Sequence, residues 1–379
     1  MLKILKNKFV IFSLILIVIA FVYFNKDKES EKKEIEKAYI NAFASVKGVE
    51  QNKIPEFDIT KIGNKREKSS FDKRLREKIL ELIKSPLNKI PVSEMFIGRE
   101  SIVDKGKYVE QKIRIFTSDS TIAYAYLLIP KDISLPAPAI IAMHQHGGTK
   151  YGAEEIIGNI GDNILFYGKE LAERGYVVFA MDAPLFGEES AMKAGNSGEK
   201  TEVFSAQGLF VLGHSPLGVV VQEDLAGLDY LSSLDFVDKD RIGCIGHSFG
   251  GVRCMYLSAL DERVKAVVLS NSVANLKFNY ETGNTHTWFS ILPGIAKYAE
   301  TNSILALISP RSLLIFYSEK DPIFILYEAE KQIEPLKGLY NKLNKKESFA
   351  SVKIPGKAHE FPIEYHEQAY EFLDKNLKN

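Results

Sequence analysis

From residue 108 onward the chain alternates short apolar runs with longer amphipathic stretches. Residues 108–116 alternate apolar and polar side chains, as a strand with one face in water does. Residues 121–129 form a second strand-like run after a turn of Thr, Ser and Asp. Further short, mostly apolar runs predict strands buried on both faces, and these runs are residues 139–143, 176–181, 242–245, 264–269, 312–317 and 351–354.

Helical patterns separate most of these predicted strands. We expect helices over residues 163–174 and 219–234, another from Gly251 and one at the C terminus. Strands that alternate with helices predict an α/β fold with a mostly parallel sheet flanked by helices. The first two strands have no helix between them, so they predict an antiparallel edge.

Residues 9–24 form an apolar run without a charged residue, and three lysines precede it. The run approaches the length of a bilayer span. Its end, at residues 21–24, is bulky and aromatic, whereas signal cleavage needs small residues. We therefore expect an uncleaved transmembrane anchor over residues 1–25, and a cleaved signal, which would give a secreted protein, is the alternative. The lysines predict an amino end inside and a large domain outside the cell membrane.

The segment after the apolar run is dense in charge. We predict a solvated tether over residues 26–70 and one folded domain over residues 71–379. An amphipathic helix at residues 71–83, with leucine and isoleucine on one face, forms the N-terminal extension of that domain. Residues 270–310 interrupt the alternation of strands and helices directly after a strand, which predicts a lid-like insertion on the side where functional groups gather.

Composition narrows the range of partners. The 379 residues are 45% hydrophobic, which supplies a sizeable core. The 49 lysine and arginine residues equal the 49 aspartate and glutamate residues, so the chain carries no basic footprint for nucleic acid. The only cysteines, Cys244 and Cys254, lie on either side of a predicted turn. We expect them to be unpaired buried side chains, since bridging them would distort that turn.

The strongest chemical signal is the sequence Gly-His-Ser-Phe-Gly at residues 246–250. It lies between the predicted strand at 242–245 and the helix that begins at Gly251. A strand that turns at once into a helix leaves no room for side chains at the flanking positions, and glycine meets that need. The serine at the apex, Ser248, is then exposed above the amino end of the helix. This context predicts a nucleophile rather than a packing turn.

A serine nucleophile needs a base, and the base needs an orienting carboxylate. Functional groups collect at the carboxyl ends of strands in an open α/β sheet. Asp321 and His359 each follow a predicted strand in the last third of the chain. We predict that they complete a catalytic triad with Ser248. Glu319, on the same turn as Asp321, is the alternative acid.

A triad of this kind also requires two backbone N–H groups that bind the oxyanion. We expect one from Phe249, after the serine, and one from His146 or Gln145 in the loop after the strand at 139–143. Two glycines follow in that loop and permit close approach of a substrate. His144 and His146 lack a third ligand of suitable spacing, so no metal site is expected.

Aromatic and histidine side chains in the insertion are candidates for the substrate pocket. Trp288, the only tryptophan, and His286 lie on this excursion from the sheet. The alternative is that these side chains cover a hydrophobic edge. His247, at the variable position before the serine, is expected to pack, whereas His214 and His366 are expected at the surface.

Together these residues resemble the α/β-hydrolase superfamily from residue 109 to the end. GHSFGG at residues 246–251, followed by Asp321 and His359, carries the resemblance. MHQHGG, ERGYVVFAMDAPLFGE and SPRSLLIFYSEKDPIF resemble, within it, the branch of dienelactone hydrolases and acetyl xylan esterases. This resemblance implies a carboxylic ester hydrolase without a cofactor. Such an enzyme acts through an acyl-enzyme on short acyl esters, with acetylated carbohydrate among the candidates. Serine in place of the cysteine of dienelactone hydrolases argues against lactone hydrolysis.

Two other functions stay open. A serine peptidase of the prolyl-oligopeptidase kind shares the order of the triad, but such enzymes usually carry a propeller domain, for which this chain has no repeat. The second is an inactive hydrolase fold retained as a surface binding module. That module would have no need for the complete set of Ser248, Asp321 and His359.

Overall fold

The computed structural model describes residues 55–190, 198–276 and 287–378, which belong to one unit of the chain. The predicted anchor at residues 1–25, most of the predicted tether and His286 lie outside the described residues. Within the described ranges, no single helix has the length and hydropathy of a membrane span. Two consecutive helices, Gly198–Val211 and Pro216–Ser232, reach both only as a pair bent by 97°.

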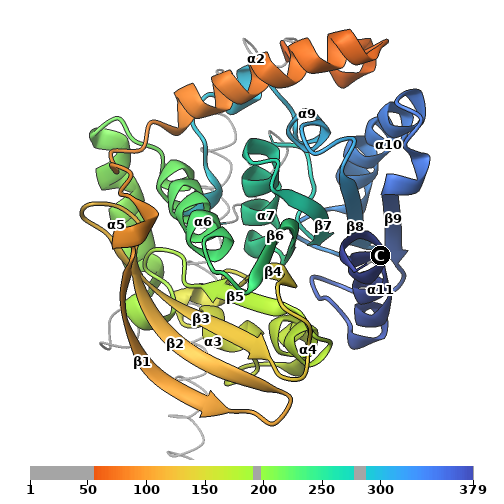
Figure 1. The fold of residues 1–379 in the computed structure, drawn as a ribbon. Helices are drawn as coiled ribbons and strands as arrows, with labels where there is room; N and C mark the ends of the chain where they lie inside the picture. Colours follow the sequence, from red (N-terminus) through yellow and green to blue (C-terminus); the bar gives the residue numbers. More distant parts are fainter. Residues whose placement is uncertain (1–54, 191–197, 277–286, 379) are drawn as a thin grey trace, which may run out of the picture. The chain divides into compact units, whose positions relative to one another are not determined.

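One nine-stranded sheet organises the described part of the chain, in the order β1-β2-β3-β5-β4-β6-β7-β8-β9 (Figure 1). The first three strands run antiparallel to their neighbours, and every pairing from β5 to β9 is parallel. This confirms the predicted parallel sheet with an antiparallel edge. The strands are β1 (Phe96–Asp104), β2 (Tyr108–Phe116), β3 (Ile122–Pro130), β4 (Ala137–Met143), β5 (Val177–Met181), β6 (Val237–His247), β7 (Val264–Ser270), β8 (Ser312–Ser318) and β9 (Phe349–Ile354).

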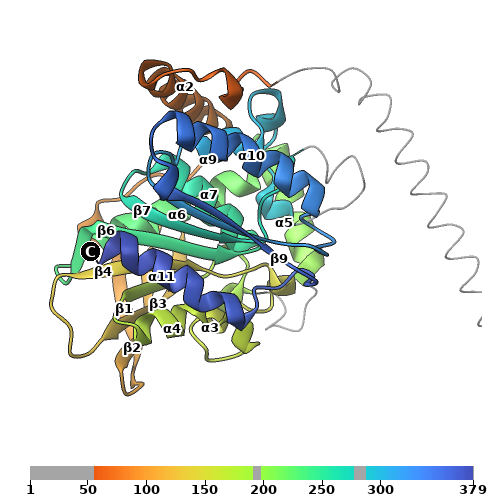
Figure 2. The same cartoon turned by 90° about the vertical axis from the view of Figure 1, so that its right-hand side faces the viewer.

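The helices cover both faces of this sheet. They are α2 (Lys65–Ile83), α3 (Ala153–Ile156), α4 (Tyr167–Glu173), α5 (Gly198–Val211), α6 (Pro216–Ser232), α7 (Phe249–Leu260), α9 (Thr301–Ala306), α10 (Leu326–Lys342) and α11 (His366–Leu377). Neighbouring residues of a strand point to opposite sides. Ile141 of β4 therefore joins the core under α2, α6, α7, α9 and α10, whereas Ile140 joins the core under α3, α4 and α11. Figure 2 shows these two groups of helices on opposite sides of the sheet.

Parallel pairing aligns the carboxyl ends of the central strands. His247 at the end of β6 pairs with Ser270 of β7, and Ser318 of β8 pairs with Ile354 of β9. The loops that leave these ends therefore meet at one edge of the sheet. The predicted triad residues Ser248, Asp321 and His359 follow strands that end at this edge.

The folded domain begins earlier than the predicted boundary at residue 71. Phe57 and Ile59 are buried, with 4% and 2% of their surface exposed, and α2 begins at Lys65 with Asn64 as its cap. Ile62 is buried as well, and these apolar side chains dock the charged segment on the domain. The prediction that residues 55–70 belong to a solvated tether is therefore wrong.

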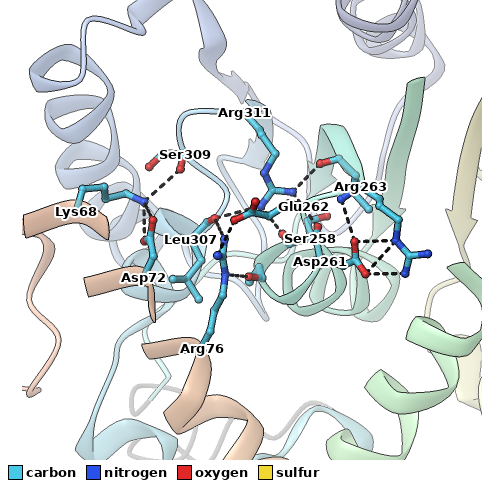
Figure 3. Close-up of polar contacts among 12 residues, drawn as sticks. Lys68, Asp72, Arg76, Ser258, Asp261, Glu262, Arg263, Leu307, Ser309 and Arg311 are labelled. Atoms are coloured by element: carbon cyan, nitrogen blue, oxygen red, sulfur yellow. Dashed lines mark hydrogen bonds and ion pairs between the residues drawn. The ribbon is translucent and has the colours of Figure 1, made fainter. Parts of the chain in front are cut away.

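Polar contacts fix α2 to the helices beneath it (Figure 3). Arg76 donates to the carbonyl oxygens of Ala259 and Leu307, at 2.9 and 3.2 Å, near the ends of α7 and α9. Arg311 donates to carbonyl oxygens of the same region, namely those of Ser258, Asp261, Val264 and Leu307. The last carbonyl groups of a helix have no donor within it, and the two guanidinium groups satisfy them.

Cys244 of β6 and Cys254 of α7 form a disulfide, with their Cα atoms 5.9 Å apart. The prediction of two unpaired cysteines is therefore wrong. Helix α7 turns back over the strand that precedes it, so residues ten positions apart come together without distortion of the turn. The bond ties the strand before Ser248 to the helix after it.

Candidate active site

Ser248 occupies a sharp turn between β6 and α7. Its φ of 55° and ψ of −122° lie in a region that residues with a Cβ rarely adopt. Its N–H donates to the carbonyl oxygen of Ser270, 2.8 Å away. The flanking glycines permit the turn, because a Cβ at Gly246 would lie 2.3 Å from the backbone of Gly250. A Cβ at Gly250 would lie 2.1 Å from the carbonyl oxygen of Met143. The predicted steric role of these glycines is confirmed.

His359 lies between Ser248 and Asp321. Its Nε2 is 2.8 Å from Ser248 Oγ, and its Nδ1 is 2.7 Å from Asp321 Oδ2. Because a carboxylate accepts hydrogen bonds, Nδ1 carries the ring proton and Nε2 accepts from the serine hydroxyl. The other oxygen of Asp321 accepts from the N–H groups of Ile323 and Phe324, at 2.8 and 2.9 Å. The structure thus brings together the three residues that the sequence predicts as a triad.

Two rings contact the imidazole of His359. Phe324 stacks on it, with ring centroids 5.7 Å apart and 18° between the planes. The ring of His247 lies with its centroid 4.9 Å away, and its Nδ1 is 3.2 Å from Ser270 Oγ. His247 is buried, which confirms the prediction that it packs. What it packs against is the imidazole of His359.

Glu319, the alternative acid, points to another partner. Its Oε2 accepts a hydrogen bond from the N–H of Gly356 at 2.7 Å. It therefore fastens the start of the loop that leads to His359, while Asp321 contacts the imidazole.

Asn271 is a residue of this site that the sequence reasoning missed. It follows β7 and is buried, with 1% of its surface exposed. Its Nδ2 donates to Ser318 Oγ and to the carbonyl oxygen of Glu360, at 3.0 and 2.7 Å, and its Oδ1 accepts from the N–H of Ser318 at 2.9 Å. One amide thus joins the end of β8 to the residue after His359. A polar residue at the end of a buried strand was the available signal.

The loop after β4 lies beside the serine turn, as predicted. Met143 pairs with Gly246 at the end of β6. His144 is fully buried, and its Nε2 accepts from the N–H of Ala183 at 2.9 Å, so Nδ1 carries the proton toward the carbonyl oxygen of Gln145. Burial lowers the pKa of His144 well below its usual value, which keeps the ring neutral. This neutral ring braces the start of the loop.

The predicted oxyanion donors lie at this junction. Phe249 is the first residue of α7, so its N–H has no acceptor within the helix. The side chains of His146 and Gln145 bond to carboxylates of other segments, those of Glu202 at 2.8 Å and Glu155 at 3.2 Å. These contacts hold in place the loop whose backbone N–H groups are the second predicted oxyanion donor.

The predicted pocket residue Trp288 lies near the same loop. The backbone N–H of Trp288 donates to Glu202 Oε1 at 2.7 Å, and the other oxygen of that carboxylate bonds to His146. The ring of Trp288 lies 6.3 Å from that of Phe210 on α5. The next residue, Phe289, is buried in a small apolar cluster with Ala183, Phe186, Val220 and Phe249. The segment with Trp288 therefore adjoins the predicted oxyanion loop.

The remaining histidines have defined partners. His366 is buried, not at the surface as predicted, and its Nδ1 bonds to Glu170 Oε2 at 2.8 Å. His214 bonds through Nδ1 to the carbonyl oxygen of Lys84 at 2.6 Å. Across the residues that the structure describes, His, Cys, Asp and Glu side chains do not gather in a group of three or more that could hold a metal ion.

A mostly parallel sheet with a strand–turn–helix elbow around Ser248 defines the class of α/β-hydrolases. The chain belongs to the Abhydrolase family, whose model matches residues 26–321. The resemblance predicted from the sequence, to an esterase-like branch of the α/β-hydrolase superfamily, is confirmed.

Known proteins resemble the chain in sequence and in fold. YtaP of Bacillus subtilis (strain 168), whose name proposes a hydrolase, is 30% identical over 261 residues, 67% of this chain and 84% of that protein. A structure from Bacteroides fragilis NCTC 9343, proposed as an acetyl xylan esterase, has a TM-score of 0.68 at 21% identity, covering 83% of this chain and 82% of its own. A glucuronoyl esterase from Solibacter usitatus has a TM-score of 0.55 at 15% identity, covering 81% and 93%. At these identities the two structures show the fold.

Proposed function

We propose that the protein is a serine carboxylic ester hydrolase that acts through an acyl-enzyme. The hydrogen-bonded chain from Ser248 through His359 to Asp321 is the observation that carries this proposal. Ser248 Oγ attacks the carbonyl carbon of the ester while its proton passes to His359 Nε2. The tetrahedral intermediate collapses, the C–O bond to the alcohol breaks, and His359 returns the proton to the leaving oxygen.

The second half of the reaction uses the same groups. A water molecule gives its proton to His359 Nε2 and attacks the carbonyl carbon of the acyl-enzyme. The serine ester bond then breaks, Ser248 Oγ regains its proton, and the carboxylic acid leaves. Asp321 fixes the tautomer of the imidazole and stabilises its positive charge in both halves.

The negative charge on the carbonyl oxygen needs donors that are in place before the reaction. The N–H of Phe249 is one, at the amino end of α7, where the helix dipole also favours negative charge. The backbone of the loop at His146 or Gln145 supplies the other. The close approach of this loop to the first turn of α7 supports the assignment, since a Cβ at Gly250 would lie 2.1 Å from the carbonyl oxygen of Met143.

The substrates we propose are short acyl esters, with carbohydrate esters as the first class to test. The similar structures proposed as an acetyl xylan esterase and named as a glucuronoyl esterase support this choice. Trp288 and His286 are the pocket residues that we propose from the sequence. An aromatic ring beside a sugar site offers a flat apolar face to the ring carbons.

We further propose that the catalytic domain is tethered to the cell membrane and faces outward. The apolar run at residues 9–24 supports the anchor. The disulfide between Cys244 and Cys254 supports an oxidising compartment, where such bonds persist. Amino-terminal sequencing of the native protein separates the two alternatives. A chain that keeps residues 1–25 supports the anchor, and one that begins just after residue 24 supports a cleaved signal.

A fluorophosphonate probe tests the proposed chemistry directly. The probe should label the protein, and peptide mapping should place the label on Ser248. Activity should be measured on a panel of p-nitrophenyl esters, acetylated sugars and aminoacyl-proline amides, which also tests the peptidase alternative. Ser248→Ala should lose the label and reduce turnover by several orders of magnitude with an unchanged thermal unfolding midpoint. Absence of labelling in the folded wild type would favour a binding module.

A further inference from the structure

Glu202 of α5 joins two segments that meet at the site. Its side chain is buried, with 4% of its surface exposed. One oxygen, Oε2, accepts from His146 Nε2 at 2.8 Å, in the loop after β4. The other, Oε1, accepts from the hydroxyl of Thr287 and from the N–H of Trp288, in the insertion after β7. Figure 2 shows α5 on the side toward which the strands of the sheet run.

The carboxylate is held in its charged form by these donors. Burial acts to raise the pKa of Glu202, but the hydrogen bonds from His146, Thr287 and Trp288 outweigh it and place the pKa below its usual value. Hydrogen bonds to a charged acceptor are among the strong ones in proteins. Glu202 is therefore a firm junction rather than a loose surface contact.

The bond to His146 also sets the proton on that ring. Nδ1 of His146 accepts from the N–H of Gly148 at 3.3 Å, so the proton lies on Nε2 and points at Glu202. Thr149, three residues after His146, has a φ of 67°, which residues with a Cβ rarely adopt. Such a backbone persists only where its surroundings hold it in place. The hydrogen bond between His146 and Glu202 helps to keep the loop in this conformation.

We propose that Glu202 is a positioning residue that fixes the oxyanion loop and the Trp288 segment as one unit. This inference rests on the proposed function. Oxyanion donors act at distances of about 2.7–3.1 Å, and a displacement of about 1 Å can cost about 100-fold in rate. Loosening the loop should therefore lower kcat, because the oxyanion forms only in the transition state. The other oxygen of the carboxylate holds the Trp288 segment, through the backbone N–H of Trp288.

The variant Glu202→Gln tests the link with little change of shape. Its amide oxygen can still accept from Thr287 and Trp288, but its NH₂ group would face the N–H of His146. We expect kcat to fall about 10- to 100-fold with KM changed less than about threefold, and the rate of fluorophosphonate labelling to fall in parallel. Labelling should still reach completion on Ser248.

The chain offers a control with the same chemistry. Glu170 of α4 also bonds to a histidine, His366 of α11, at 2.8 Å, and 32% of the Glu170 side chain is exposed. Glu170→Gln should lower the thermal unfolding midpoint while leaving kcat within about twofold of the wild type. If Glu202→Gln loses no more kcat than this control, the positioning role is refuted while the proposed function stands. A wild type without labelling or esterase activity would instead refute the proposed function.

A second variant keeps the test decisive if Glu202→Gln does not fold. His146→Phe keeps the backbone N–H of the loop and a ring next to Phe186, whose centroid lies 5.5 Å from that of His146. It removes the donor to Glu202 and, with Nδ1, the acceptor for the N–H of Gly148. We expect at least the loss of kcat seen in Glu202→Gln, and the effects of the two variants should not add fully when combined, since both break the bond between His146 and Glu202. An unchanged kcat in His146→Phe, or full additivity in the double variant, would overturn the proposal.

Discussion

Asn271 donates a hydrogen bond from Nδ2 to the carbonyl oxygen of Glu360, 2.7 Å away. The two residues are 89 positions apart in the sequence. Glu360 directly follows His359, so this bond holds the loop that carries the imidazole against the end of β7. The same side chain bonds to Ser318 on β8, the strand that leads to Asp321. The relative positions of base and acid therefore depend on an amide that touches neither.

Asn271→Leu should reduce kcat more than it changes KM, because it frees the loop of His359 without altering the substrate pocket. It also leaves the N–H of Ser318 and the carbonyl of Glu360 without their partner, which costs about 1–3 kcal/mol for each buried group. Steady-state kinetics and denaturant unfolding of the folded variant measure both effects. Wild-type kcat together with reduced stability would show that the amide serves the fold alone.

The order of the triad could be predicted because each member follows a strand. Apolar runs mark the strands, and the carboxyl ends of parallel strands share an edge, so Ser248, Asp321 and His359 were bound to converge. Asn271 also follows a strand, and Glu202 lies within a helix, but neither position indicates what the side chain contacts. Their roles come from contacts with segments far along the chain, and a lone polar residue after a strand or within a helix does not reveal its partner.

Other features were hidden by local composition. Strand β1 has most of its side chains exposed, so it lacks the alternation that marks a half-buried strand. Helix α5 exposes Phe204 and Val211 to solvent and buries Glu202, the reverse of an ordinary amphipathic pattern. The disulfide between Cys244 and Cys254 depends on the way α7 lies back on β6, which the sequence of the turn between them does not indicate.

Asp321→Asn should lower turnover about 10³- to 10⁴-fold while the protein stays folded. The amide would present either an NH₂ group or a weaker acceptor to His359 Nδ1, so the imidazole would lose its tautomer and its counter-charge. The control is Glu319→Gln, because Glu319 bonds to the backbone of Gly356 and not to the imidazole. We expect this control to keep kcat within about tenfold of the wild type. The reverse ranking, measured by kcat at saturating ester, would identify Glu319 as the acid.

Glu223 should make the protein less stable as the pH rises. Burial, with Glu189 and Asp224 nearby, raises the pKa of Glu223 to about 8. The unfolded chain releases this proton near its ordinary pKa of 4.5, whereas the folded protein holds it to about pH 8. Below pH 4.5 the protonated side chain costs the folded protein nothing. Between pH 4.5 and about pH 8 only the unfolded chain releases the proton, so the free energy of unfolding falls as the pH rises. Glu223→Gln mimics the protonated form, so its thermal midpoint relative to the wild type should rise between about pH 5 and pH 8.

Glu170→Gln gives the opposite dependence and serves as the comparison. Burial acts to raise the pKa of Glu170, but hydrogen bonds from His366 and Tyr370 outweigh it and lower the pKa overall. Its stabilising contribution is present above the ordinary pKa and is lost as the pH falls. The deficit of this variant should therefore shrink in acid. Parallel pH profiles for the two variants would contradict both assignments.

Gly250→Ala should damage both the fold and the activity. The added Cβ would lie 2.1 Å from the carbonyl oxygen of Met143 and 2.8 Å from that of His144, and neither backbone oxygen can move without shifting the loop after β4. We expect a loss of about 1–3 kcal/mol in the free energy of unfolding. A loss of kcat should accompany it, since the displaced loop carries one of the proposed oxyanion donors.

Gly208→Ala is the matched control for Gly250→Ala, because Gly208 lies in α5 with no atom within 4 Å of its added Cβ. That change should stabilise the protein by about 0.5–1 kcal/mol, because alanine lowers the conformational entropy of the unfolded chain, and it should leave kcat unchanged. Denaturant unfolding and esterase kinetics on both variants check the contrast, and equal effects at the two positions would mean that the close approach at Gly250 does not constrain the site.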